Sequence, residues 1–77
     1  MSPIRLSDTE IGKCYKILSL SCEDERKERL NALGFIPGAT IKTALKSPFG
    51  KPSAYLVCGT LIALRDEEAE QIYVEVI

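Results

Sequence analysis

The sequence predicts a mainly β fold, a small and partly open barrel of short strands with one α-helix and one helical turn. Three observations support this prediction. A chain of 77 residues can build one hydrophobic core but hardly a second. Short apolar segments alternate with turns that contain glycine or proline along most of the chain. Closing the sheet also leaves few strand edges exposed, which favours a barrel in so small a protein.

The first half of the chain is expected to hold one strand and the helix. Residues 13–20 mix apolar and polar side chains on a short period, which is typical of a strand. Ser21 then begins a helix over about residues 22–33, because Asp24 follows it by three positions in a capping-box arrangement. Acidic residues in the first turn complement the helix dipole.

The end of this helix and the turn after it are also marked in the sequence. Leu30 and Leu33 lie on one side of the helix, and both are expected to pack against the core. Gly34 ends the helix, because glycine readily adopts the left-handed conformation. The segment Ile36–Ala39 carries proline and then glycine at its two central positions, which predicts a type II turn.

Four further strands and the helical turn fill the second half. The strands are expected at residues 40–46, 54–58, 60–64 and 72–76, and the helical turn at about 66–71. Residues 60–64 are apolar on both faces, as a central or barrel strand would be. Alternation assigns an inner face to Ile41, Thr43, Leu45, Ile72, Val74 and Val76. We therefore expect one domain over residues 1–77, an SH3-like barrel of five strands.

Composition and charge exclude several classes of protein. The net charge of −1 gives no strong footprint for nucleic acid, so no nucleic-acid partner is expected. No apolar run approaches the roughly 20 residues of a membrane span, and the N-terminus lacks the apolar core of a secretory signal. We therefore expect a cytoplasmic protein without direct membrane insertion.

The charged residues are unevenly distributed along the chain. Over residues 31–64 the only charged side chains are Lys42, Lys46 and Lys51, whereas several acids and no base follow Arg65. A basic middle beside an acidic tail predicts a polarised surface, which would help to orient a protein partner.

Neither a catalytic centre nor a metal site is expected. The chain has no histidine, which excludes imidazole-based catalysis and zinc sites built with imidazole. Cys14, Cys22 and Cys58 lack the close spacing of metal ligands, and their odd number argues against a disulfide framework. We expect them to be reduced and buried thiols. Neither a phosphate-binding glycine loop nor a nucleophile motif is found, so we expect no enzyme activity and no cofactor.

Two residues are candidates for contact with a partner. Phe49 lies at the tip of a turn-rich loop, where a large apolar side chain is easily left exposed. Arg65 stands between the apolar strand and the acidic turn, where its guanidinium can grip a phosphate or carboxylate of a partner. An internal pair with Asp66, Glu68 or a backbone carbonyl explains Arg65 equally well.

Three segments resemble one known family. The run Arg29–Ile41, RLNALGFIPGATI, is similar to the RLxxLG-[large apolar]-xPGxxI signature of the ferrous iron transport protein A (FeoA) family. The loop Ser47–Pro52 is similar to the APLGDP loop of that family, and Thr60–Ala69 resembles its apolar strand, ALR sequence and helical turn. Order and spacing match over residues 5–76. Lys51 departs from the family pattern, which usually has an acid there.

The resemblance implies an SH3-like barrel that acts in bacterial ferrous iron uptake. It implies a non-enzymatic accessory protein that binds the cytoplasmic GTP-binding domain of the ferrous iron permease FeoB, with weak homo-oligomer formation left open. We assign the partner contact first to Phe49, Lys46 and Lys51, and second to Arg65. Two alternatives are a small carrier that binds a transition metal ion, and a stand-alone SH3-like domain related to metal-dependent repressors.

Overall fold

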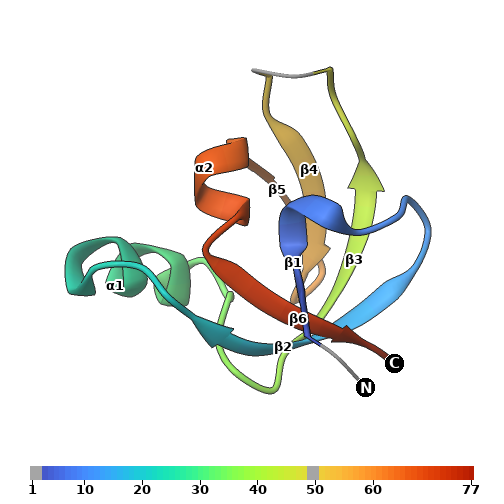
Figure 1. The fold of residues 1–77 in the computed structure, drawn as a ribbon. Helices are drawn as coiled ribbons and strands as arrows, with labels where there is room; N and C mark the ends of the chain where they lie inside the picture. The colour runs from blue at the N-terminus through green and yellow to red at the C-terminus, as the bar shows by residue number, and fades with distance from the viewer. Residues whose placement is uncertain (1–2, 49–50) are drawn as a thin grey trace.

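One curled antiparallel sheet organises the protein (Figure 1). The structure is a computed structural model that describes residues 3–48 and 51–77. In chain order the elements are β1 (Ile4–Arg5), the 3-10 helix η1 (Leu6–Asp8), β2 (Cys14–Leu20), α1 (Asp24–Ala32), β3 (Thr40–Leu45), β4 (Ser53–Val57), β5 (Thr60–Leu64), α2 (Asp66–Ala69) and β6 (Ile72–Val76). The strand order in the sheet is β1-β6-β2-β3-β4-β5, so β1 and β5 are its two ends.

The mainly β prediction is confirmed, but the predicted five-stranded barrel is wrong in detail. The described residues form six strands, and no ladder joins β1 to β5, so the sheet stays open. The strand β1 is not predicted from the sequence, because two residues are too few to show an alternating pattern. The register with β6, which places Ile4 opposite Val74, is what assigns β1 to the sheet.

Two shifts in strand register decide which side chains face the core. In β2 the register with β6 shifts between Ile17 and Ser19, and in β3 the register with β4 shifts between Thr43 and Leu45. Each shift inserts one residue and reverses the alternation beyond it. Leu20 is therefore buried, whereas Leu45, predicted to face inward, is 56% exposed.

The core lies inside the curl of the sheet. Its buried apolar side chains are Leu6, Tyr15, Ile17, Leu20, Leu30, Phe35, Ile41, Tyr55, Val57, Leu64, Ala69, Ile72 and Val74. Val76, predicted to face inward, is the last residue of β6 and is partly exposed. Residues 60–64, predicted as a central or barrel strand, instead form the end strand β5, which among the described strands pairs with β4 alone.

The helix α1 begins at Asp24 rather than at residue 22, because Ser21 is held elsewhere. The backbone N–H of Ser21 donates to the carbonyl oxygen of Gln71 at 2.8 Å, and its hydroxyl donates to the same oxygen at 3.3 Å. Glu23 is the N-cap residue instead, in an extended conformation and with no side-chain capping hydrogen bond.

The helix ends at Ala32, and Gly34 terminates it as predicted. Gly34 has a φ of +107°, and the N–H groups of Gly34 and Phe35 each donate at 3.0 Å, to Asn31 and Leu30 respectively, as in a Schellman motif. Leu30 and Phe35 are fully buried. Leu33, predicted to pack on the core, is 41% exposed, because Phe35 takes the core position next to Leu30 after the chain reverses.

The helical turn α2 ends at Ala69 rather than at residue 71. The N–H of Gln71 donates to the carbonyl oxygen of Glu68 at 3.2 Å, after which the chain enters β6. Within residues 3–48 and 51–77, neither helix has the length and apolar character needed to cross a membrane.

We expect Gly34→Ala to lower the free energy of unfolding by about 2 kcal/mol or more. The new Cβ would sit 3.2 Å from Cys58 Sγ, and the backbone would keep a φ that side chains rarely adopt. Urea denaturation measures the loss. Gly12→Ala is the control, since Gly12 also has a positive φ but nothing within 4 Å of its added Cβ. Equal losses in the two variants would contradict a role for the close approach to Cys58.

Candidate partner-binding surface

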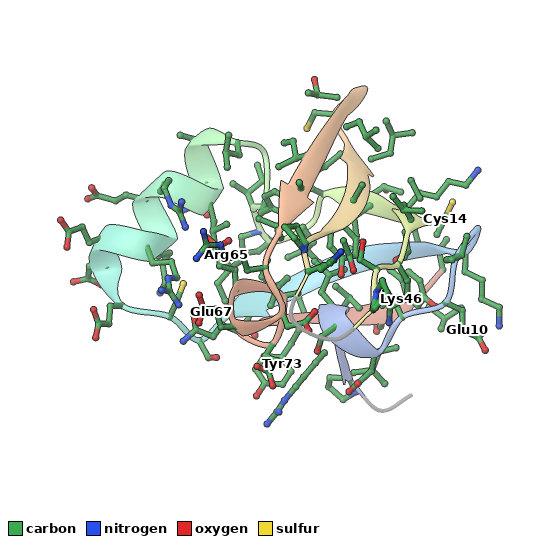
Figure 2. All side chains as sticks on the ribbon, turned by 90° about the horizontal axis from the view of Figure 1, so that it is seen from above. Glu10, Cys14, Lys46, Arg65, Glu67 and Tyr73 are labelled. Atoms are coloured by element: carbon green, nitrogen blue, oxygen red, sulfur yellow. The ribbon has the colours of Figure 1, made fainter. Side chains whose placement is uncertain are left out.

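A cleft opens between η1, which follows β1, and α2, which follows β5. The end of β3 and the start of β4 complete its lining. Lys46 and Arg65, two of the four predicted contact residues, both line this cleft, and Figure 2 shows Arg65 with Glu67 at α2 and Lys46 beside η1. Lys51 is exposed but is not part of the lining, and Phe49 lies outside the described residues.

Lys46 fixes one wall of the cleft. Its Nζ donates to the carbonyl oxygen of Ser7 at 2.6 Å and to that of Thr9 at 3.0 Å, which ties the chain just after β3 to η1. An ammonium group has three donors, so one of them is left over for a partner. Lys46 therefore has a role in the fold, and its role in binding stays a prediction.

Arg65 presents its side chain on the opposite side of the cleft. As the N-cap residue of α2 it is extended, with φ −75° and ψ 156°, and its backbone N–H donates to Glu68 Oε1 at 3.2 Å. Its guanidinium is exposed, and within residues 3–48 and 51–77 it forms no ion pair, neither with Asp66 nor with Glu68. The planar fork of donors is therefore available to a partner carboxylate or phosphate.

Glu68, considered from the sequence only as a candidate internal partner of Arg65, connects the two helices. It is only 8% exposed; one carboxylate oxygen accepts from the Arg65 N–H and the other accepts from Arg29 Nη2 of α1. Arg26 of α1 forms a second link, from its Nη1 to Gln71 Oε1 at 2.8 Å. The detectable sequence signal is the capping-box spacing of Glu68, three positions after Arg65; its pairing with Arg29, 39 positions away, becomes evident only in the fold.

Acidic and basic side chains meet in the cleft instead of forming separate surfaces. The charged residues of the lining are Asp8, Lys46, Arg65, Asp66, Glu67 and Glu70. The predicted division into a basic middle and an acidic tail does not hold here, because the curl of the sheet brings α2 close to the end of β3. A lining of mixed charge suits a partner surface that also carries both signs.

Tyr55 lies under the cleft with its ring fully in the core. Burial raises the pKa of the Tyr55 hydroxyl above its usual 10.0, a hydrogen bond with Ser53 acts in the opposite direction, and the negative charge of Asp66 raises it further. The hydroxyl is therefore a protonated hydrogen-bonding group at neutral pH, not a charged one.

The cysteines contradict the expectation of buried thiols, although all three are free. Cys14 begins β2 and is exposed, near the edge of the molecule in Figure 2. Cys58 is exposed in the turn between β4 and β5, and only Cys22 packs partly against the core. Among the residues that the structure describes, no three Cys, Asp or Glu side chains come together in a group that could hold a metal ion.

We expect Glu68→Ala to lower the free energy of unfolding by about 1–3 kcal/mol, because the Arg65 N–H and the Arg29 guanidinium lose their acceptor. Chemical denaturation measures this loss. Glu67→Ala is the control on the same helical turn, since Glu67 is exposed, and its effect should stay within about 0.5 kcal/mol. Similar losses in both variants would mean that the link between the helices does not stabilise the fold.

Stability should also fall at alkaline pH through Tyr55. Its pKa is raised in the folded state, so the unfolded chain loses this proton first as the pH rises past about 10, and the unfolded state gains in stability. We expect Tyr55→Phe to flatten the decline in urea midpoint between about pH 9 and pH 11. Tyr73→Phe is the control. An unchanged decline in Tyr55→Phe would assign the alkaline effect to other groups.

The chain matches a known protein family and several solved structures. The FeoA domain model matches residues 4–76. The solved FeoA protein of Chlorobium tepidum is 31% identical with a TM-score of 0.88, over 96% of this chain and 70% of that one. The FeoA of Stenotrophomonas maltophilia, described as a prokaryotic SH3 domain protein in complex with zinc, is 29% identical with a TM-score of 0.81, over 94% and 89% of the two chains. The SH3-like prediction is thereby confirmed.

A more distant likeness shows the fold alone. A manganese-dependent transcriptional repressor has a TM-score of 0.88 at 12% identity, over 100% of this chain and 44% of the repressor. No curated protein sequence matches the chain. The family model covers nearly all of the sequence and agrees with the three resembling segments, so this chain belongs to the FeoA family, which is associated with ferrous iron transport.

Proposed function

We propose that this protein is a non-enzymatic, cytoplasmic accessory protein of bacterial ferrous iron uptake, which binds the cytoplasmic GTP-binding domain of an FeoB-type permease. Membership of the FeoA family over residues 4–76 is the observation that carries the proposal. The relative from Stenotrophomonas maltophilia is described as a candidate activating factor of ferrous iron transport, which supports an accessory role.

The surface chemistry supports binding in preference to a reaction. The cleft between η1 and α2 offers charged side chains, and its exposed Arg65 has no ion-pair partner among residues 3–48 and 51–77. An exposed guanidinium without an ion-pair partner can form two charged hydrogen bonds to one partner carboxylate. We assign the partner contact to the surface around this cleft. Arg65 is its main cation, and Lys46 and Lys51 lie on the side of the β3–β4 loop.

The proposal is tested by calorimetric titration against the purified GTP-binding domain of the permease from the same organism. The titration is run with GDP and with a non-hydrolysable GTP analogue. We expect binding in at least one nucleotide state, and we expect it to weaken as salt rises, because the contact is made by exposed charges. Absence of binding in both states would contradict the proposed partner domain.

The site is tested separately by Arg65→Ala. Loss of a bidentate charged contact should weaken binding about tenfold or more. Arg5→Ala is the matched control, since Arg5 is an exposed arginine on β1 outside the cleft lining, and it should bind like the unchanged protein. If Arg65→Ala binds as well as Arg5→Ala, the proposed partner stands but the contact surface assigned to it is wrong.

A metal carrier is the second candidate function, because the Stenotrophomonas maltophilia relative is described in complex with zinc and because Cys14 and Cys58 are exposed here. Anaerobic titration with ferrous iron separates the two functions. Stoichiometric binding of iron that is lost in Cys14→Ser or Cys58→Ser, together with no binding to the permease domain, would favour the carrier.

A further inference from the structure

The end strand β5 is an unprotected sheet edge. Edge strands are usually shielded by a charge, a proline, a bulge or a very short length. The opposite end of the sheet follows this rule, because β1 has two residues, one of them Arg5, and leads directly into η1. By contrast, β5 has five residues, Thr60–Leu64, without a charge, proline or glycine, and among the described strands it pairs with β4 only.

The turn before β5 determines which of its backbone groups are free. Cys58 and Gly59 have φ values of 51° and 76°, as in a two-residue type I′ hairpin. The closing pair of such a hairpin, Val57 and Thr60, exchanges its backbone hydrogen bonds, and the pattern then alternates along the strand. Leu61 and Ala63 therefore direct their N–H and C=O groups away from β4. No backbone hydrogen bond to another part of the described chain engages these groups.

The outer face beside this edge is apolar. The strand registers place Leu56 opposite Leu61, and Ala54 opposite both Ala63 and Leu45. Leu61 is 62% exposed, the highest exposure of any large apolar residue of the described strands. A strand added to β5 would extend this face and would cover part of Leu61.

We propose that β5 pairs antiparallel with β5 of a second copy of this chain, around a two-fold axis at Ile62. In this register Leu61 lies opposite Ala63 of the second copy, and Ala63 lies opposite Leu61 of the second copy. All the free N–H and C=O groups of β5 are then paired. Registers centred on residue 61 or 63 would instead pair half of these groups with Gly59 or Arg65.

Charge favours a second copy as the occupant, and the size of the contact limits its affinity. The strand is neutral, so the self-pair brings no like charges into opposition, and each chain carries a net charge of only −1. The contact is a single pair of short strands with few covered side chains, which is smaller than the roughly 1,200 Å² of a stable interface. We therefore expect a dimer that forms at about 0.1–1 mM protein.

Sedimentation equilibrium of the full chain over about 10 µM to 1 mM tests this dimer. Ala63→Pro removes an N–H that points away from β4, so it should weaken association about tenfold or more without breaking the β4–β5 ladder. Circular dichroism checks that the variant is folded. A chain that stays monomeric at 1 mM, or a folded Ala63→Pro variant that associates normally, overturns the proposal.

Two lysine variants distinguish association through the β5 edge from association through the apolar outer face. Leu61→Lys places a charge on the edge strand, whereas Leu45→Lys places one on the same outer face at β3, two strands away. We expect Leu61→Lys to weaken association about tenfold and Leu45→Lys to change it less than about twofold. Equal effects of the two variants would indicate stacking of faces and would overturn the edge pairing.

The register is tested by disulfide formation. Ile62 opposite Ile62 would be a non-hydrogen-bonded pair with Cα atoms about 4.5 Å apart, within the range of a disulfide. In a chain whose native Cys14, Cys22 and Cys58 are replaced by serine, Ile62→Cys should form an oxidised dimer, and Leu45→Cys should not. No cross-link at residue 62, or a stronger one at residue 45, contradicts the register.

Discussion

The curl of the sheet depends on two inserted residues, and most other features depend on the curl. A bulge bends its strand and increases the local twist. With one shift after Ile17 in β2 and another after Thr43 in β3, the sheet wraps around Tyr15 and Tyr55 and buries both rings. The same shifts reverse the alternation beyond them, so Leu45 is exposed on the outer face. These two positions therefore determine which side chains line the core and which face outward.

The curl does not close, and the open sheet leaves two different ends. One end, β1, is short and passes into η1, where Lys46 holds the carbonyl groups of Ser7 and Thr9. The other end, β5, is longer and neutral, and the chain leaves it through Arg65 into α2. The cleft lies between the segments that follow these two ends. The candidate partner-binding surface and the unprotected edge thus share one origin, the missing ladder between β1 and β5.

A charged contact also links the two α-helices of this open fold. The buried carboxylate of Glu68 receives a backbone N–H of its own helical turn and the guanidinium of Arg29, so α1 is tied to α2 and not only to the sheet. Arg65 forms no ion pair among the described residues, and its exposed guanidinium is available to a partner. This agrees with an accessory protein that recognises a partner by charge.

Features that depend on local chemistry were predictable from the sequence. Gly34 ends α1, and in the turn at Ile36–Ala39 the N–H of Ala39 donates to the carbonyl oxygen of Ile36 at 3.1 Å. The five predicted strands lie within a residue or so of their predicted places. Caps, turns and alternation act over only a few residues. The family was also detectable, since its motifs fall on these local signals. Three other features became evident only in the folded chain: the pairing of Arg29 with Glu68, the outward position of Leu45 and the place of β5 at an edge. These depend on bulges and on contacts between distant segments, where alternation gives no information about which strand lies next to which.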